Sequence, residues 1–308
     1  MLTLMRSSQS LITARAPRPR YKVRGVVCMP IWLPGFLYFL DWRKWFSQLE
    51  EELSHYHFVL EPIFYKANEE TEPAFVDRVL RFNPDYVLWN WPCEADRTTM
   101  HSIADTGVAL VLIQYEQDQQ FPGRVYRVSY ERGLRQGLTE WAASGKIKNI
   151  VIPQSSLPKD TISLSIRSVL KACPLPCRYG ICPGEGASTA DLLSYLRELA
   201  PNRRTGVVFG DDILYAQLCA QVPEAMLEFI RRHRVIVTRQ VTTHLRRSTP
   251  PPGITVDAVL YSLKKLARRI AMDLGRSKGA IPSTHSVLEA EWRPQIPLAS
   301  VVQTVCDE

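Results

Sequence analysis

Residues 124–152 constrain the fold of this chain more than any other stretch. They read RVYRVSYERGLRQGLTEWAASGKIKNIVI, which predicts a strand, a polar turn, an amphipathic helix and a second, buried strand. Leu134, Leu138 and Trp141 share one face of this helix, and Gly145 is a typical residue to end it. Strands and helices also alternate on both sides of the block. We therefore predict an α/β protein with two Rossmann-like lobes, each built on a parallel sheet, and a ligand-binding cleft between them.

The predicted elements on either side of the block continue this alternation. Before it, we expect strands at 23–29, 58–65, 85–89, 108–113 and 125–128 and helices at 41–55, 72–82 and 97–106. After it, we expect strands at 149–152, 177–181, 205–209 and 235–238 and helices at 161–172, 189–199, 213–220 and 223–230. A Pro-rich turn at 248–253 then precedes a long predicted helix, whose apolar residues keep helical spacing from Val256 to Leu274.

Charge and composition exclude several classes of protein. The net charge is +7, but six basic residues precede the first acidic residue, Asp41, so the excess belongs to an N-terminal tail. No apolar stretch reaches the roughly 18 residues of a membrane span and none resembles a secretory signal, which predicts a cytoplasmic protein. The seven cysteines are odd in number and scattered, so we expect no disulfide framework. Cys173, Cys177 and Cys182 lack the paired spacing of a zinc site, and we predict neither a metal nor a cofactor.

Four segments resemble the effector-binding part of LacI/GalR-type transcriptional regulators. They are residues 128–152, 165–169 (SIRSV), 207–212 (VVFGDD) and 235–274. The resemblance covers about residues 22–293. It implies the periplasmic-binding-protein-like fold of type I, which periplasmic sugar-binding proteins share, with a small-molecule effector between the lobes and a homodimer. It also implies a DNA-binding head, which the first twenty residues are too short to form, so we expect DNA contact only through a head absent from this chain.

Four positions depart from the pattern of that family. Ser129 and Gln240 stand where aspartates are frequent, Gly210 where an asparagine is frequent, and Leu170 where a glycine is common. These changes remove usual acceptors for sugar hydroxyl groups. The departures argue against an ordinary sugar, whereas the resemblance itself implies a sugar or a sugar-like small molecule as the effector, without naming it.

The candidate site consists of residues at the carboxyl ends of the predicted strands, where open α/β sheets bind their ligands. Aromatic side chains there could cover the apolar face of a sugar, and polar ones could direct hydrogen bonds. The candidate ligand-binding residues are Trp32, Tyr65, Trp89, Asn90, Trp91, Gln114, Ser129, Arg167, Asp211 and Gln240. Two simpler roles remain open. A tryptophan at a strand end often only packs in the core, and Asp211 could cap the following helix.

The resemblance also divides the chain. We expect a basic tail at 1–20, a first lobe at 21–145 plus 256–276, a second lobe at 146–255 plus 277–294, and a C-terminal tail at 295–308. Crossovers are expected near 144–146, 253–255 and 275–278.

The expected function is that of a ligand-sensing domain of a transcriptional regulator. A solute-binding protein of a transport system is the first alternative, although no secretory leader is visible. A small-molecule enzyme is less favoured, because the chain has neither a phosphate-binding G-x-x-x-x-G-K-[ST] loop nor a G-x-S-x-G nucleophile elbow.

Overall fold

The structure is a computed structural model that describes most residues from 23 to 304. The residues in this span that it leaves undescribed are 39, 67, 91, 93, 116–122, 155–167, 174, 182–190, 192–193, 195, 197, 199–203, 211–217, 219–221, 239–240, 244–251 and 278–284. The expected tail at 1–20 lies outside the described residues. No helix among those described is long and apolar enough to cross a membrane.

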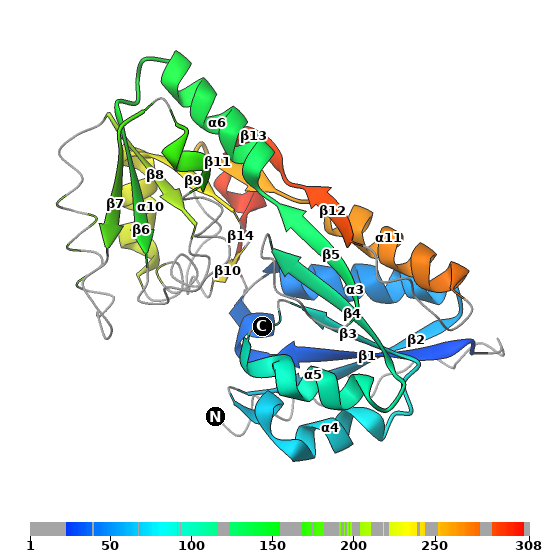
Figure 1. Ribbon diagram of the computed structural model, residues 1–308. Coiled ribbons are helices and arrows are strands. Elements are labelled where there is room, and N and C mark those ends of the chain that lie inside the picture. Colours follow the sequence, from blue (N-terminus) through cyan, green and yellow to red (C-terminus); the bar gives the residue numbers. More distant parts are fainter. Residues whose placement is uncertain are drawn as a thin grey trace.

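The first lobe is built on a six-stranded sheet with the order β12-β5-β4-β3-β1-β2, and all of its neighbouring strands are parallel. The strands are β1 (Gly25–Trp32), β2 (Phe58–Tyr65), β3 (Tyr86–Asn90), β4 (Ala109–Tyr115), β5 (Arg124–Ser129) and β12 (His285–Glu289). One face packs against α3 (Leu40–Ser54) and α11 (Leu263–Arg276), and the other against α4 (Pro73–Leu80) and α5 (Arg97–Ala104) (Figure 1). A short helix, α2 (Leu33–Tyr38), follows β1 directly.

The second lobe is built on another six-stranded sheet, with the order β13-β11-β9-β8-β6-β7. Its strands are β6 (Asn149–Gln154), β7 (Cys177–Ile181), β8 (Thr205–Phe209), β9 (Arg234–Val237), β11 (Thr255–Leu260) and β13 (Glu291–Pro297). All pairs are parallel except β11–β13, which is antiparallel. The described helices of this lobe include α6 (Glu131–Ala143) and α10 (Pro223–Arg232). A separate pair joins β10 (Val241–Thr243) to β14 (Val302–Thr304).

Burial on both faces explains why β3 forms a central strand. All of its residues, YVLWN, are buried, as parallel sheets covered by helices require. Leu88 packs with the core under α3 and α11, whereas Val87 and Trp89 pack with the core under α4 and α5. The alternation of side chains thus fills two separate hydrophobic layers. The predicted α/β class with two parallel sheets is confirmed.

Two glycines bring α6 close to the second sheet. A Cβ at Gly133 would lie 2.6 Å from Val259 Cγ1 of β11, and one at Gly137 would lie 2.5 Å from the ring of Trp292 in β13. We expected 131–143 to lie with the first lobe, but this helix packs on the second sheet. The sequence shows the apolar face of the helix and does not show which sheet it covers.

Three further expectations about segments differ from the structure. Residues 256–260 form β11 of the second sheet instead of the start of a helix, and α11 begins only at Leu263, capped by the Ser262 hydroxyl, which accepts from Lys265 N at 3.2 Å. Residues 285–289 form β12 of the first sheet, although we placed 277–294 in the second lobe. Residues 295–304 are not a featureless tail, since they complete β13 and form a 3-10 turn, η3 (Leu298–Ser300), and β14.

The chain passes between the lobes at three neighbouring points. β5 continues into α6 at Tyr130, β11 continues into α11 at Tyr261, and β12 continues into β13 at Ala290. The rings of Tyr130 and Tyr261 meet edge to face with centroids 6.3 Å apart, and Ala290 N donates to Ser129 O at 2.7 Å. These three residues are buried. The crossings therefore form one compact hinge beside β5 and β12, and the positions that we expected, near 144–146, 253–255 and 275–278, are wrong.

Candidate ligand-binding cleft

The carboxyl ends of the first-lobe strands meet at one edge of the sheet. β1 ends at Trp32, β3 at Asn90 and β5 at Ser129, and in Figure 1 the arrowheads of these strands point to the side where the second lobe lies. The arrowheads of β6 and β7 point from the second lobe towards the first. This is the arrangement in which α/β sheets bind ligands beyond their strand ends.

Asn90 is the strongest candidate for a ligand contact. Its side chain is only 4% exposed, and neither its amide oxygen nor its amide nitrogen has a hydrogen-bond partner. It occupies the last position of β3, beside Ile113 of β4. Burying a polar group without a partner costs about 1–3 kcal/mol, and the great majority of buried polar groups are paired. Other buried atoms, such as Trp45 Nε1 and Trp89 Nε1, also have no partner, so the position of Asn90 at the end of a strand is what singles it out. An amide at that position could donate to and accept from a bound molecule.

Two of the predicted aromatic contacts, Tyr65 and Trp89, are buried in the hydrophobic core. Trp89 is fully buried, and its ring lies 5.9 Å from that of Phe75 on α4, while Tyr65 is 8% exposed and lies 5.5 Å from the same ring. All three belong to the layer under α4 and α5. Tyr65 and Trp89 therefore have a packing role in this layer, and their contact with a ligand stays a prediction.

Trp32 keeps a partly exposed position at the end of β1. Its ring lies over Gly35 of α2, because a Cβ at Gly35 would come within 2.8 Å of Trp32 Cε3. The side chain also contacts both hydrophobic layers of the first lobe. Among the predicted aromatic contacts whose side chains the structure describes, Trp32 is thus the one that is partly exposed and able to cover an apolar face of a ligand.

The other predicted site residues are less informative. Gln114 lies in β4 with its backbone paired to Arg127, but its side chain is outside the described part of the structure. Trp91, Arg167, Asp211 and Gln240 lie outside the described residues altogether. Ser129 ends β5, and its hydroxyl accepts from Glu131 N at 3.4 Å. The structure therefore places Trp32, Asn90 and Ser129 at one edge of the first sheet.

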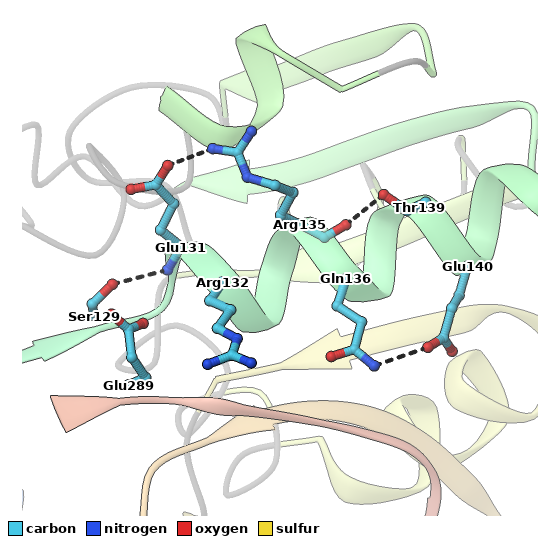
Figure 2. Close-up of a pocket in the computed structure, with 8 residues that line it drawn as sticks. All are labelled: Ser129, Glu131, Arg132, Arg135, Gln136, Thr139, Glu140 and Glu289. Atoms are coloured by element: carbon cyan, nitrogen blue, oxygen red, sulfur yellow. Dashed lines mark hydrogen bonds and ion pairs between the residues drawn. The ribbon is translucent and has the colours of Figure 1, made fainter.

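A shallow hollow of about 610 Å³ lies along α6, beside the hinge. Figure 2 shows its lining residues: Ser129, Glu131, Arg132, Arg135, Gln136, Thr139, Glu140 and Glu289. Several of its polar side chains bond within the helix, since Arg135 forms an ion pair with Glu131 and the Gln136 amide donates to Glu140 Oε1 at 3.2 Å. Such i,i+4 pairs are typical of a solvated helix face. We therefore do not assign this hollow as the ligand site.

Three basic residues of α11 lie beside acidic neighbours. Lys265 Nζ lies 2.9 Å from Glu291 of β13, Arg268 Nε lies 3.4 Å from Glu52 of α3, and Arg269 Nε lies 3.3 Å from Asp273. The bond from Lys265 lowers the pKa of the Glu291 carboxyl. This pairing favours a structural role over contact with DNA, and Lys265–Glu291 links the lobes across the hinge.

Two carboxylates that the sequence did not single out, the buried Asp257 and the partly buried Asp273, connect elements within each lobe. Asp257 is 1% exposed, and its Oδ2 accepts from Trp141 Nε1 at 2.7 Å and from Arg234 at 2.7 Å. Its Oδ1 accepts from Gln295 N at 2.8 Å. In the first lobe, Asp273 accepts from Arg124 at 2.6 Å and from the Tyr126 hydroxyl at 2.7 Å. Each of these partners is a donor within the protein. Both carboxylates therefore have a structural role.

Within the described ranges, no group of three or more His, Cys, Asp or Glu residues is arranged to hold a metal ion.

Comparison with known proteins shows the fold. No family model and no curated protein matches the sequence. Among solved structures, a LacI transcriptional regulator from Lactobacillus brevis matches with a TM-score of 0.63 at 13% identity, over 87% of this chain and 100% of that one. A LacI family regulator from Arthrobacter sp. FB24, in complex with lactose, matches with a TM-score of 0.62 at 14% identity, over 88% of this chain and 98% of that one.

A third match comes from a transport system. An ABC transporter solute-binding protein from Agrobacterium vitis, bound with α-D-tagatopyranose, matches with a TM-score of 0.61 at 11% identity, over 90% of this chain and 95% of that one. The chain therefore has the two-lobed, periplasmic-binding-protein-like fold of type I, and these similar structures are regulators and binding proteins.

Proposed function

We propose that this chain is the ligand-sensing domain of a transcriptional regulator and that it binds a sugar or a sugar derivative between its two lobes. The observation that carries the proposal is the unpaired, buried amide of Asn90 at a strand end that faces the second lobe. A side-chain amide offers two donors and an acceptor, which suits vicinal hydroxyl groups. Trp32, partly exposed at the same edge, would cover an apolar face of the sugar ring.

The fold supports a mechanism based on rotation of the lobes. A ligand that contacts both lobes favours the closed arrangement by the difference between its affinities for the closed and open states. The rotation would occur at the compact hinge formed by Tyr130, Tyr261 and Ala290. We propose that a homodimer transmits this rotation, and that DNA is read by a part of the protein other than the two lobes.

A solute-binding protein of a transport system is the second candidate, because the tagatose-bound protein from Agrobacterium vitis has the same fold. Both candidates bind the ligand in the same cleft. They differ in the partner that recognises the closed state, which is DNA for a regulator and a transporter for a solute-binding protein. We favour the regulator, and we propose that it lies in the cytoplasm. We also propose that it binds its ligand without converting it chemically.

Thermal unfolding against a panel of ligands tests the proposal. The panel contains monosaccharides, sugar acids, sugar phosphates and nucleosides. A ligand that binds only the folded state stabilises it by about 2.7 kcal/mol at a hundredfold excess over its Kd. We expect at least one sugar or sugar derivative to raise the unfolding midpoint of the wild type and of the surface control Gln136→Ala. No shift with any compound, or a shift only with nucleosides, would refute the proposal.

A further inference from the structure

The two lobes meet at a second place besides the hinge. Strand β10 follows β9 of the second sheet, and it contacts both α2 and α3 of the first lobe. β10 is paired in parallel with β14, with Val241 opposite Val302, Thr242 opposite Gln303 and Thr243 opposite Thr304. The C-terminal strand thus supports the segment that touches the first lobe. In Figure 1 both strands lie in the region between the lobes.

This second contact lies on the side of the first sheet away from the hinge. The hinge is beside β5 and β12, whereas α2 follows β1, and β4 and β3 separate β5 from β1. Neighbouring strands are about 4.8 Å apart, so the two contacts are separated by roughly 14 Å across the sheet. A contact at that distance from the hinge opens when the lobes rotate apart.

Both sides of the contact are anchored. On the first lobe, the ring of Phe36 in α2 lies 6.4 Å from that of Phe46 in α3 and 5.2 Å from that of Phe64 in β2. On the second lobe, Leu298 and Val301 are 2% and 0% exposed, and Leu298 N donates to Ile254 O at 2.9 Å. β14 therefore starts directly after a buried anchor.

We propose that β14 is a clasp: by pairing with β10, it holds the second lobe against α2 and α3 at the side opposite the hinge. The inference rests on the proposed function in that the region it closes is the ligand cleft. A pair of three-residue strands is marginally stable by itself, so the clasp depends on its contact with the first lobe. A contact of this kind opens locally at low cost, which lets ligand enter and adds to the stability of the closed state.

Removal of the clasp in the ligand-free protein tests this inference. We would compare a chain that ends at Val301 with a control chain that ends at Thr304, because both lack 305–308 and only the first lacks β14. Amide hydrogen exchange and small-angle X-ray scattering are the readouts. We expect at least tenfold faster exchange at Val241–Thr243, faster exchange in α2, and a larger radius of gyration in the shorter chain only.

A point variant keeps the test independent of the truncation. Gln303→Pro removes a backbone donor from β14, and Gln303→Ala is its control. The proline variant should reproduce the faster exchange in β10 and α2. Unchanged exchange in both, or faster exchange confined to β10 with an unchanged radius of gyration, would overturn the clasp. Since no ligand is present, the outcome is separate from that of the thermal panel, and an intact clasp with no ligand shift would refute only the proposed function.

Discussion

Asn90 and Asp257 are both buried polar residues, and their surroundings assign them opposite roles. Asp257 has protein donors on both carboxylate oxygens, whereas neither polar atom of the Asn90 side chain has a partner. The sequence predicted Asn90 from its place at the end of a strand. It could not single out Asp257, because a lone aspartate in an apolar run carries no sign of the indole and guanidinium that surround it. For a similar reason, the sequence did not show that Phe75 packs against both Tyr65 and Trp89.

Replacement of Asn90 by leucine should stabilise the ligand-free protein. The variant removes an unpaired buried amide, which costs about 1–3 kcal/mol, and keeps a side chain of similar length. We expect the free energy of unfolding, measured by urea denaturation, to rise by about 1 kcal/mol. A loss of stability would mean that the Asn90 amide has a hydrogen-bond partner in the ligand-free protein, which would contradict its role as a free ligand contact.

Replacement of Asp257 by asparagine should have the opposite effect. The change leaves the guanidinium of Arg234 without its carboxylate partner. Because Asp257 is buried but the Arg234 side chain is 31% exposed, we expect the cost of a charged hydrogen bond, about 1–3 kcal/mol. Urea denaturation should show a loss of this size. Glu289→Gln, at an exposed position, is the control and should stay within about 0.5 kcal/mol of the wild type. Equal effects of the two changes would contradict the structural role of Asp257.

His233 should make stability depend on pH. Burial lowers the pKa of its imidazole, and repulsion by Arg232 acts in the same direction. The unfolded state then binds more protons than the folded state as the pH falls through the ordinary histidine pKa of about 6.5. Stability is therefore greatest above that pH and is lost as the pH falls. His233→Phe, which keeps a ring beside Phe229, should show a smaller loss between pH 7.5 and pH 5.5, and an equal loss in both proteins would exclude this role.

At the scale of elements, the sequence predicted where strands and helices lie along the chain better than it predicted which sheet each of them joins. Thr255–Leu260 was read as helix because Val256, Val259 and Leu260 fit a helical period, yet these residues form a buried strand. Short apolar runs fit both periods, and only the pairing of β11 between β13 and β9 in the second sheet decides between them. The assignment of α6 to the first lobe failed because its partner residues, in β11 and β13, lie more than a hundred positions later.

The close packing of α6 on β13 can be tested at Gly137. A methyl group there would lie 2.5 Å from the Trp292 ring, so Gly137→Ala should destabilise the protein by about 1–3 kcal/mol despite the better helix propensity of alanine. Combining it with Trp292→Leu should give a smaller loss than the sum of the two single changes, as measured by a double-mutant cycle. Additive effects would show that the helix does not depend on this contact.

At the scale of the whole molecule, the two-lobed architecture was predictable and its hinge was not. Alternating strands and helices indicate two parallel sheets, but the crossing points depend on which sheet each late segment joins. β11, β12 and β13 exchange sheets within a short stretch of chain, and the resulting crossings gather at Tyr130, Tyr261 and Ala290. A hinge this compact fits a rotation of rigid lobes, in which the ligand and the clasp both act on the same closed state.

The measurement that tests the central claim most directly is the unfolding midpoint of wild type and Asn90→Leu, side by side, with and without the sugar that stabilises the wild type most. We predict that the order reverses. Without ligand the leucine variant should unfold at the higher temperature, and with ligand the wild type should, because only the amide can bind the sugar. An equal ligand shift in both proteins would contradict the claim that Asn90 binds the ligand between the lobes.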